Sequence, residues 1–181
     1  SLADESIAGN GTQAVTATTN LDTQGEVIML TETGTDSGVF EGTVDLVPTP
    51  TAPGDGQLQV AHDGTVSVLY VDADDGNGGT FVPVTASASI DCAPPVISDI
   101  LVEAVTGDSA AVSWITGEKT DGTVYYRPQG AVSWSEVVDA NFGTTHAIIL
   151  EGLSECTTYQ FQITAVDGAG NEQTSGGTPF T

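Results

Sequence analysis

The pattern that most constrains the fold is a series of short segments of alternating apolar residues, separated by turn residues. In the first half, such segments predict strands at 12–19, 26–33, 39–47, 57–61, 65–71 and 80–90. Two sets of side chains are each expected to share one face: Phe40, Val44 and Leu46, and Val66, Val68 and Tyr70. Gly, Asp, Asn and Pro between the segments favour turns. Short strands, frequent turns and no sustained helical period predict an all-β fold, a β-sandwich.

A break in composition divides the chain in two. Cys92 and Ala93 are followed by Pro94 and Pro95, and consecutive prolines cannot continue a strand ladder. One β-sandwich usually takes about 90 residues, so the 181 residues predict two tandem β-sandwich domains, 1–91 and 92–181. The run 27–30 in the first half is apolar on both faces, which places it centrally in its sheet.

The second half carries strand-like segments at 110–114, 122–127, 146–150 and 159–165. Together with Trp114, Leu153 and Tyr159 at their spacings, these segments resemble a bacterial fibronectin type III domain across residues 94–181. Val112 and Trp114 are expected to point inward. The resemblance implies that the Tyr159 hydroxyl bonds back to the backbone, as in the tyrosine corner of such domains.

The first half shows a weaker resemblance. Its segments 26–33, 36–42 and 70–75 resemble an Ig-like module that is repeated in large bacterial surface and secreted proteins. The resemblance covers most of residues 10–90 and implies no defined activity.

The charge balance excludes several classes of partner. The chain has 25 acidic residues against Lys119 and Arg127, a formal net charge of −23. Phosphate backbones and anionic lipids are bound by clusters of Lys and Arg, so nucleic acid and an anionic membrane surface are excluded as partners. No apolar run approaches the roughly 20 residues of a membrane span, so direct membrane insertion is excluded too.

The two cysteines, Cys92 and Cys156, leave two alternatives open. An even count in a chain of secreted character suggests a disulfide. In the fibronectin type III topology, however, Cys92 precedes the first strand and Cys156 lies in a turn at the other end of the sandwich, beyond the roughly 7 Å Cα reach of a bridge. Either an intramolecular bridge forms, or each cysteine pairs with a neighbouring module or chain.

No catalytic constellation is evident, and the chain is predicted not to be an enzyme. His62 and His146 are the only histidines, they fall in different predicted domains, and no nucleophile, zinc or phosphate-loop motif accompanies them. Both histidines are expected at the surface or at a sheet edge.

Calcium is the most plausible specific ligand, because hard cations take several carboxylate and carbonyl oxygens. The candidate ligands are Asp72, Asp74, Asp75 and Asn77, in a loop that departs from the EF-hand pattern. The alternative is a solvated Asp/Gly hairpin loop. Weaker candidates for calcium are Asp22 with Glu26, Asp36 and Asp55. Asp167 and Asn171 are expected to form a self-bonded turn.

These features favour a non-catalytic extracellular structural or adhesive module, a spacer or assembly unit of a cell-surface or secreted protein. Its partners would be neighbouring modules or identical subunits. One alternative is a carbohydrate- or protein-binding accessory module of a secreted enzyme, in which Trp134 would contact the ligand. Another is a filament or surface-layer subunit, in which residues 1–11 pair with a neighbour's sheet edge.

Overall fold

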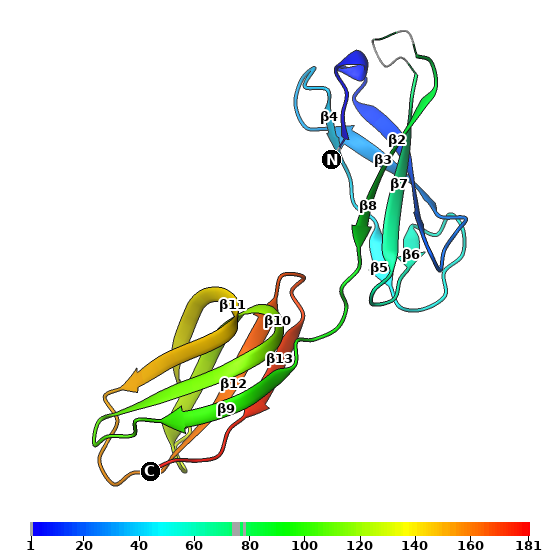
Figure 1. Ribbon diagram of the computed structural model, residues 1–181. Coiled ribbons are helices and arrows are strands. Elements are labelled where there is room, and N and C mark those ends of the chain that lie inside the picture. The colour runs from blue at the N-terminus through cyan, green and yellow to red at the C-terminus, as the bar shows by residue number, and fades with distance from the viewer. Residues whose placement is uncertain (1, 74–76, 78) are drawn as a thin grey trace. The chain divides into compact units, whose positions relative to one another are not determined.

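The computed structural model describes residues 2–73, 77 and 79–181. The chain forms two compact units, Ser1–Cys92 and Ala93–Thr181, which we call the N-terminal and C-terminal units. Both are built from strands (Figure 1), and the helical element in the described ranges is a single short turn, η1 (Glu5–Ile7). Within those ranges, no helix has the length and apolar character needed to cross a membrane. The chain is therefore all-β, with two β-sandwich domains in tandem.

The N-terminal unit is built on a six-stranded antiparallel sheet. In spatial order its strands are β1 (Leu2–Ala3), β4 (Val39–Glu41), β3 (Glu26–Glu32), β2 (Thr12–Thr19), β7 (Thr65–Asp72) and β8 (Val82–Ser89). A small second sheet pairs β5 (Asp45–Val47) with β6 (Gln57–Gln59) in parallel. The strands predicted from residues 12–19, 65–71 and 80–90 are β2, β7 and β8.

The prediction of one strand over residues 39–47 is wrong. The chain leaves the large sheet after β4 and joins the small sheet as β5. The crossing is close: a Cβ on Gly42 would lie 2.7 Å from Leu30 Cδ2 and 3.2 Å from the Met29 carbonyl oxygen. Phe40 is consequently buried while Leu46 is 48% exposed, so these two side chains do not share a face.

The N-terminal segment is already paired within its own chain. Leu2–Ala3 pairs antiparallel with β4, and η1 follows it. Pairing of residues 1–11 with a neighbour's sheet edge, which would replace this pairing, stays a prediction. The inner face of the sheet carries the core of this unit, formed by Val15, Leu30, Phe40 and Tyr70.

The run 27–30 lies in β3, between β4 and β2, so its central place in the sheet order is confirmed. Its burial is not, because Val27 is 67% and Met29 57% exposed. The outer face of this sheet therefore carries solvent-exposed apolar side chains.

The C-terminal unit contains β9 (Ile97–Glu103), β10 (Ser109–Pro128), β11 (Ser135–Glu151), β12 (Tyr159–Asp167) and β13 (Glu172–Gly176). The first half of β10 pairs with β9 and with the end of β11, and its second half pairs with β12 and with the start of β11. The register shifts between Ile115 and Thr120. Such a bulge lets one strand bend from one sheet into the other without a loop. The separately predicted strands 110–114 and 122–127 are thus two halves of β10.

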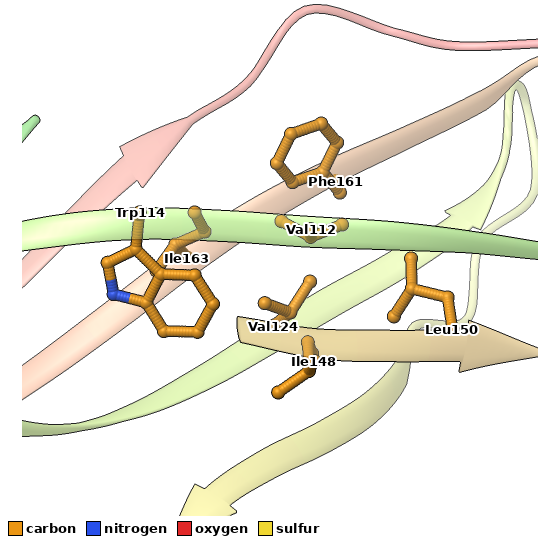
Figure 2. Close-up of a cluster of buried hydrophobic side chains, with 7 residues drawn as sticks. All are labelled: Val112, Trp114, Val124, Ile148, Leu150, Phe161 and Ile163. Carbon is orange, nitrogen blue, oxygen red and sulfur yellow. The ribbon is translucent and has the colours of Figure 1, made fainter. Parts of the chain in front are cut away.

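The side chains that face inward from both layers form one core (Figure 2). Its buried members are Val112, Trp114, Val124, Ile148, Leu150, Phe161 and Ile163. Trp114 is 1% exposed and Val112 fully buried, which confirms that they point inward. Along β12 every second residue from Tyr159 to Asp167 is buried, the pattern of a strand with one face on the core.

The tyrosine corner is also confirmed. The Ser154 backbone N–H donates to the Tyr159 hydroxyl oxygen over 3.0 Å. Tyr159 also forms an isolated bridge with Phe180, and the two rings stack with centroids 5.8 Å apart. The chain end is thereby fixed against β12.

Candidate functional site

His146 is the centre of a buried polar cluster in the C-terminal unit. It lies on β11, and its ring stacks on Trp114 with centroids 4.9 Å apart and planes 8° from parallel. The Nδ1 atom is 2.9 Å from Asp139 Oδ2. The Nε2 atom is 3.0 Å from the Gly143 carbonyl oxygen and 3.2 Å from Thr120 Oγ1. The cluster therefore joins the two bent strands β10 and β11 where they pass between the sheets.

His146 does lie on an edge strand, because β11 ends the sheet order, but a surface position is wrong for it, because its side chain is 0% exposed. With no access to solvent, the ring cannot reach a substrate. Both ring nitrogens have hydrogen-bond partners inside the unit, Asp139 at Nδ1 and the Gly143 carbonyl and Thr120 hydroxyl at Nε2. The sequence did contain the signal: His146, Ile148 and Leu150 alternate along one strand face.

His62 does lie at the surface. Its side chain is 46% exposed, with Nδ1 3.2 Å from Asp91 Oδ1 and Nε2 3.6 Å from Asp63 Oδ1. The two histidines belong to different units. His62 Nδ1 also accepts from the backbone N–H of Cys92 over 3.3 Å, whereas the hydroxyl nearest to His146 is that of the buried Thr120.

Two carboxylates considered for calcium instead hold turns of the N-terminal unit. Glu26 is 4% exposed and accepts from the backbone N–H of Gly54 and of Gly56, at 2.6 and 3.1 Å. Asp22 accepts from the Gly25 N–H and the Thr51 hydroxyl, at 2.9 and 2.8 Å. The backbone hydrogen bond from Gly25, with help from Thr51, lowers the pKa of Asp22. Both carboxylates therefore accept hydrogen bonds from donors of the protein itself.

Glu32 plays the same part at the N-terminus. Its carboxylate accepts from the backbone N–H groups of Gly38, Gly9 and Gly11, at 2.9, 3.1 and 3.3 Å. The hydrogen bond from Gly38, followed by that from Gly9, lowers the pKa of Glu32. One side chain thus ties the segment before β2 to the turn before β4.

Tyr70 and Asp4 form a second tie at this end. The Tyr70 hydroxyl donates to Asp4 Oδ2 over 2.8 Å. Burial, and then the hydrogen bond to Asp4, raise the pKa of Tyr70 to about 12. Burial opposes ionisation of Asp4, but the hydrogen bonds from Ser6 and Tyr70 outweigh it and lower the pKa of that carboxyl.

The turn expected at Asp167 and Asn171 is present. Asp167 Oδ1 accepts from the backbone N–H of Ala169 and Asn171, and Oδ2 accepts from Asn171 Nδ2. Burial works against ionisation, yet these hydrogen bonds, chiefly those from Asn171, leave the pKa of Asp167 below its usual value.

The structure places the remaining candidate residues as follows. Asp74 and Asp75 lie outside the described residues, while Asp72 is half-buried and Asn77 exposed. Asp55 accepts from the N–H of Ala52 and of Gln57 in its own turn, and Asp36 is exposed. Among the described residues, these candidate acids do not gather into one group of carboxylates that could hold a calcium ion.

Trp134 is half-exposed and carries a cation on its ring. The Arg127 guanidinium carbon lies 4.1 Å from the ring centroid, and Arg127 Nη1 donates to the Val132 carbonyl over 2.9 Å. A cation–π contact of this kind contributes about 0.5–1 kcal/mol at an exposed site. The contact fixes the orientation of the ring and uses one face of it.

An apolar groove opens on the inner face of the six-stranded sheet. Its volume is about 480 Å³. It is lined by Leu2, Ala3, Val15, Ala17, Ile28, Leu30, Gly42, Val44, Val66, Val68, Tyr70, Val84 and Ala86. The expectation that Val66, Val68 and Tyr70 share a face is confirmed here. None of the lining side chains is charged, and the hydroxyl of Tyr70 is taken by Asp4.

The comparisons with known proteins concern the C-terminal unit most directly. Residues 98–181 match the family described as purple acid phosphatase, N-terminal domain, a non-catalytic domain of an enzyme family with a fibronectin-like fold. The strand pairing, the buried Trp114 and the Tyr159 corner agree with this. The C-terminal unit has a fibronectin type III-like fold.

Among solved structures, a segment of two fibronectin type III domains from chicken tenascin is 19% identical, covering 94% of this chain and 83% of that one, with a TM-score of 0.44. A fibronectin type III domain of human collagen XX is 17% identical, covering 49% of this chain and 95% of that one, with a TM-score of 0.38. No curated protein matches the sequence.

Both cysteines are exposed and unpaired in the structure. Cys92 ends the N-terminal unit. Cys156 sits in the turn before β12 of the fibronectin type III-like unit, with a positive φ of 53°. Pairing of either thiol with a neighbouring module or chain stays a prediction.

Proposed function

We propose that the chain is a structural or adhesive part of a larger extracellular or cell-surface protein, where it serves as a spacer or assembly unit. The observation that carries the proposal is the use made of the polar groups. His146, Glu26, Glu32 and Asp167 all bond to the protein's own backbone or core. A chain whose buried and half-buried polar side chains bond to its own backbone in this way is organised to keep a stable shape.

The acidic surface supports the same proposal. Apart from Lys119 and Arg127, its charged side chains are carboxylates. A strongly negative surface keeps a protein soluble and limits non-specific contact with anionic surfaces. This suits a spacer that is held out in solvent.

The proposed location is tested by antibody labelling of intact cells of the source organism. We expect the chain to be labelled, and cut by added protease, without lysis, while a cytoplasmic enzyme in the same cells stays protected. Labelling that requires lysis would contradict an extracellular role.

A second candidate is an accessory module that binds a glycan or a protein for a secreted enzyme. The half-exposed Trp134, held by Arg127, favours it. So does the match to a non-catalytic domain of an enzyme family. A glycan array tests it: binding that Trp134→Ala abolishes would support the accessory role, and an array without binding by the intact chain would count against it.

We also propose calcium as a cofactor of the loop that contains Asp72 and Asn77. The support is chemical: the loop sequence offers several carboxylates and an amide, the oxygen ligands that calcium prefers. Thermal unfolding with calcium, compared with sodium at matched ionic strength, tests this proposal.

A further inference from the structure

We propose that the N-terminal unit binds an extended, cationic peptide segment. The segment pairs with the free edge of β8 and places its apolar side chains in the groove. This goes beyond the proposed spacer role and does not depend on where the protein is located.

The groove supplies the apolar part of the argument. It is bordered by side chains from β1, β2, β3, β7 and β8, and neither β5 nor β6 contributes to its lining. The small sheet therefore leaves this part of the inner face open. Val84, on the rim, is 46% exposed. Covering such side chains with apolar groups removes them from water, which contributes a favourable free energy of about 25 cal/mol per Å² of apolar surface buried.

The free edge of the sheet, at β8, is where the backbone of the peptide would pair. Strand β8 ends the sheet order, and in the described part of the chain it pairs with β7 alone (Figure 1). Residues 83–89 are all exposed. Natural edge strands are commonly protected by charged residues, yet β8 carries none and has Pro83 alone as a protective residue. An unprotected edge of eight residues can accept a further strand.

The edge and the groove adjoin. Val84 and Ala86 belong to β8 and also line the groove. In a paired strand every second side chain points to the same face. A strand added beside β8 would therefore direct alternate side chains to the groove face, next to Val84 and Ala86.

Charge selects the partner. The N-terminal unit contains neither Lys nor Arg. Exposed Glu41 and Asp45 are the chain neighbours of the groove residues Gly42 and Val44. A cationic segment is attracted to such a surface, whereas a second copy of this acidic unit or an anionic lipid is repelled. The partner is thus a strand-forming peptide with apolar residues at alternate positions and Lys or Arg between or beside them.

The test uses the whole chain and a labelled peptide of alternating Lys and Val, with binding followed by fluorescence anisotropy. Two control peptides are a Lys/Val peptide with its valines in one block and an alternating Glu/Val peptide. We expect the alternating cationic peptide to bind at least tenfold more tightly than either control. We also expect it to slow amide exchange in β8.

Two variants place the same charge on opposite faces of β8. Ala86→Asp puts a carboxylate at the groove, and we expect it to weaken binding at least tenfold although it adds attraction for the lysines. Ser87→Asp, one residue further on, pairs with Ser67 in β7 and points to the other face, so we expect binding to be kept. Both positions are exposed, so both variants should fold.

Three results would overturn the proposal. The first is no binding of the alternating peptide. The second is equal binding of the blocked peptide, which would show general charge attraction. The third is self-association of the chain that Ala86→Asp abolishes, which would make a second copy the occupant of the groove. Cell labelling, which tests the location, is unaffected by any of these.

Discussion

The buried ring of His146 makes a stacking contact and several polar contacts at once. Its ring is stacked on Trp114 and enclosed by Asp139, Gly143 and Thr120. A buried polar group costs free energy unless its hydrogen bonds are made. Because the partners come from both β10 and β11, the ring stabilises the bend of two strands at once.

We predict that His146→Phe destabilises the C-terminal unit by about 2–4 kcal/mol. The phenyl ring keeps the stack but leaves Asp139 and the Gly143 carbonyl without their donor. Urea unfolding followed by tryptophan fluorescence reports this unit alone, since both tryptophans lie in it. The matched control is Thr145→Phe, at an exposed position of β11 in the same unit, expected to cost less than about 0.5 kcal/mol. Equal effects of the two variants would contradict the assigned role.

Gly122 marks a second tightly determined position. A Cβ there would lie 2.4 Å from Trp114 Cζ2. We predict that Gly122→Ala costs about 1–3 kcal/mol, because a buried ring has no room to withdraw. Gly176→Ala is the control, since a Cβ at Gly176 meets nothing within 4 Å. The same urea unfolding measures both, and a neutral Gly122→Ala would show that the core relaxes around the added methyl group.

At the scale of elements, the carboxylates act as local clamps. Glu32 holds three backbone N–H groups from two segments far apart in the sequence. β1 itself contributes only two residues to the sheet, Leu2 and Ala3. The attachment of this segment therefore depends on side chains as well as on strand pairing.

We predict that Glu32→Gln increases hydrogen–deuterium exchange at Gly9, Gly11 and Gly38. The neutral amide keeps one acceptor oxygen but loses the charge, and hydrogen bonds to a charged acceptor are about twice as strong. Glu41→Gln, at an exposed position of the neighbouring strand β4, is the control and should leave these amides unchanged. Unchanged exchange in Glu32→Gln would mean that strand pairing alone holds the segment.

The elements also show what the sequence could predict. Alternation and turn residues located β2, β7, β8 and β12, because each is a continuous strand with a regular pattern. The same reasoning failed at 39–47, where the chain leaves β4 for the small sheet and passes close to Leu30 at Gly42. That contact joins distant residues, and a local pattern carries no information about it.

The candidate site shows the same division. The Asp167 turn is a local feature that its turn residues predict, and the Tyr159 corner is what the resemblance to fibronectin type III domains implies. The burial of His146 depends on Thr120 and Asp139, which approach it only after β10 and β11 have paired. The groove likewise arises from the assembly of five strands.

At the scale of the whole molecule, stability should depend on pH at both ends of the range. The pKa values of Asp4, Asp22, Glu32 and Asp167 are lowered in the folded state. Groups with a lowered pKa stabilise the fold above their unfolded pKa, and this is lost as pH falls through the folded one. We therefore predict that the urea concentration at the midpoint of unfolding decreases as the pH is lowered below about 4. A midpoint that stays constant there would contradict the assigned hydrogen bonds.

The alkaline side has the opposite sign. The pKa of Tyr70 is raised to about 12, so its contribution is complete below its unfolded pKa near 10 and is lost as pH rises towards about 12. Tyr70→Phe cannot ionise. We predict that the variant is less stable near neutral pH by about 0.5–1.5 kcal/mol, through the lost bond to Asp4, but declines less steeply above about pH 10. If the urea midpoints of the variant and of the unchanged protein decreased equally above about pH 10, this role of Tyr70 would be contradicted.

Calcium is best tested on the intact chain, because a net charge of −23 responds to any cation. Screening by salt reduces the repulsion among carboxylates without a bound ion. A bound ion stabilises the fold further, by an amount that grows with its concentration over its dissociation constant. We therefore predict that calcium raises the thermal midpoint more than sodium does at matched ionic strength. Asp72→Asn should remove the excess, and Asp63→Asn, in an exposed turn, should keep it. Equal shifts with the two cations would reduce the effect to screening and leave the loop a solvated turn.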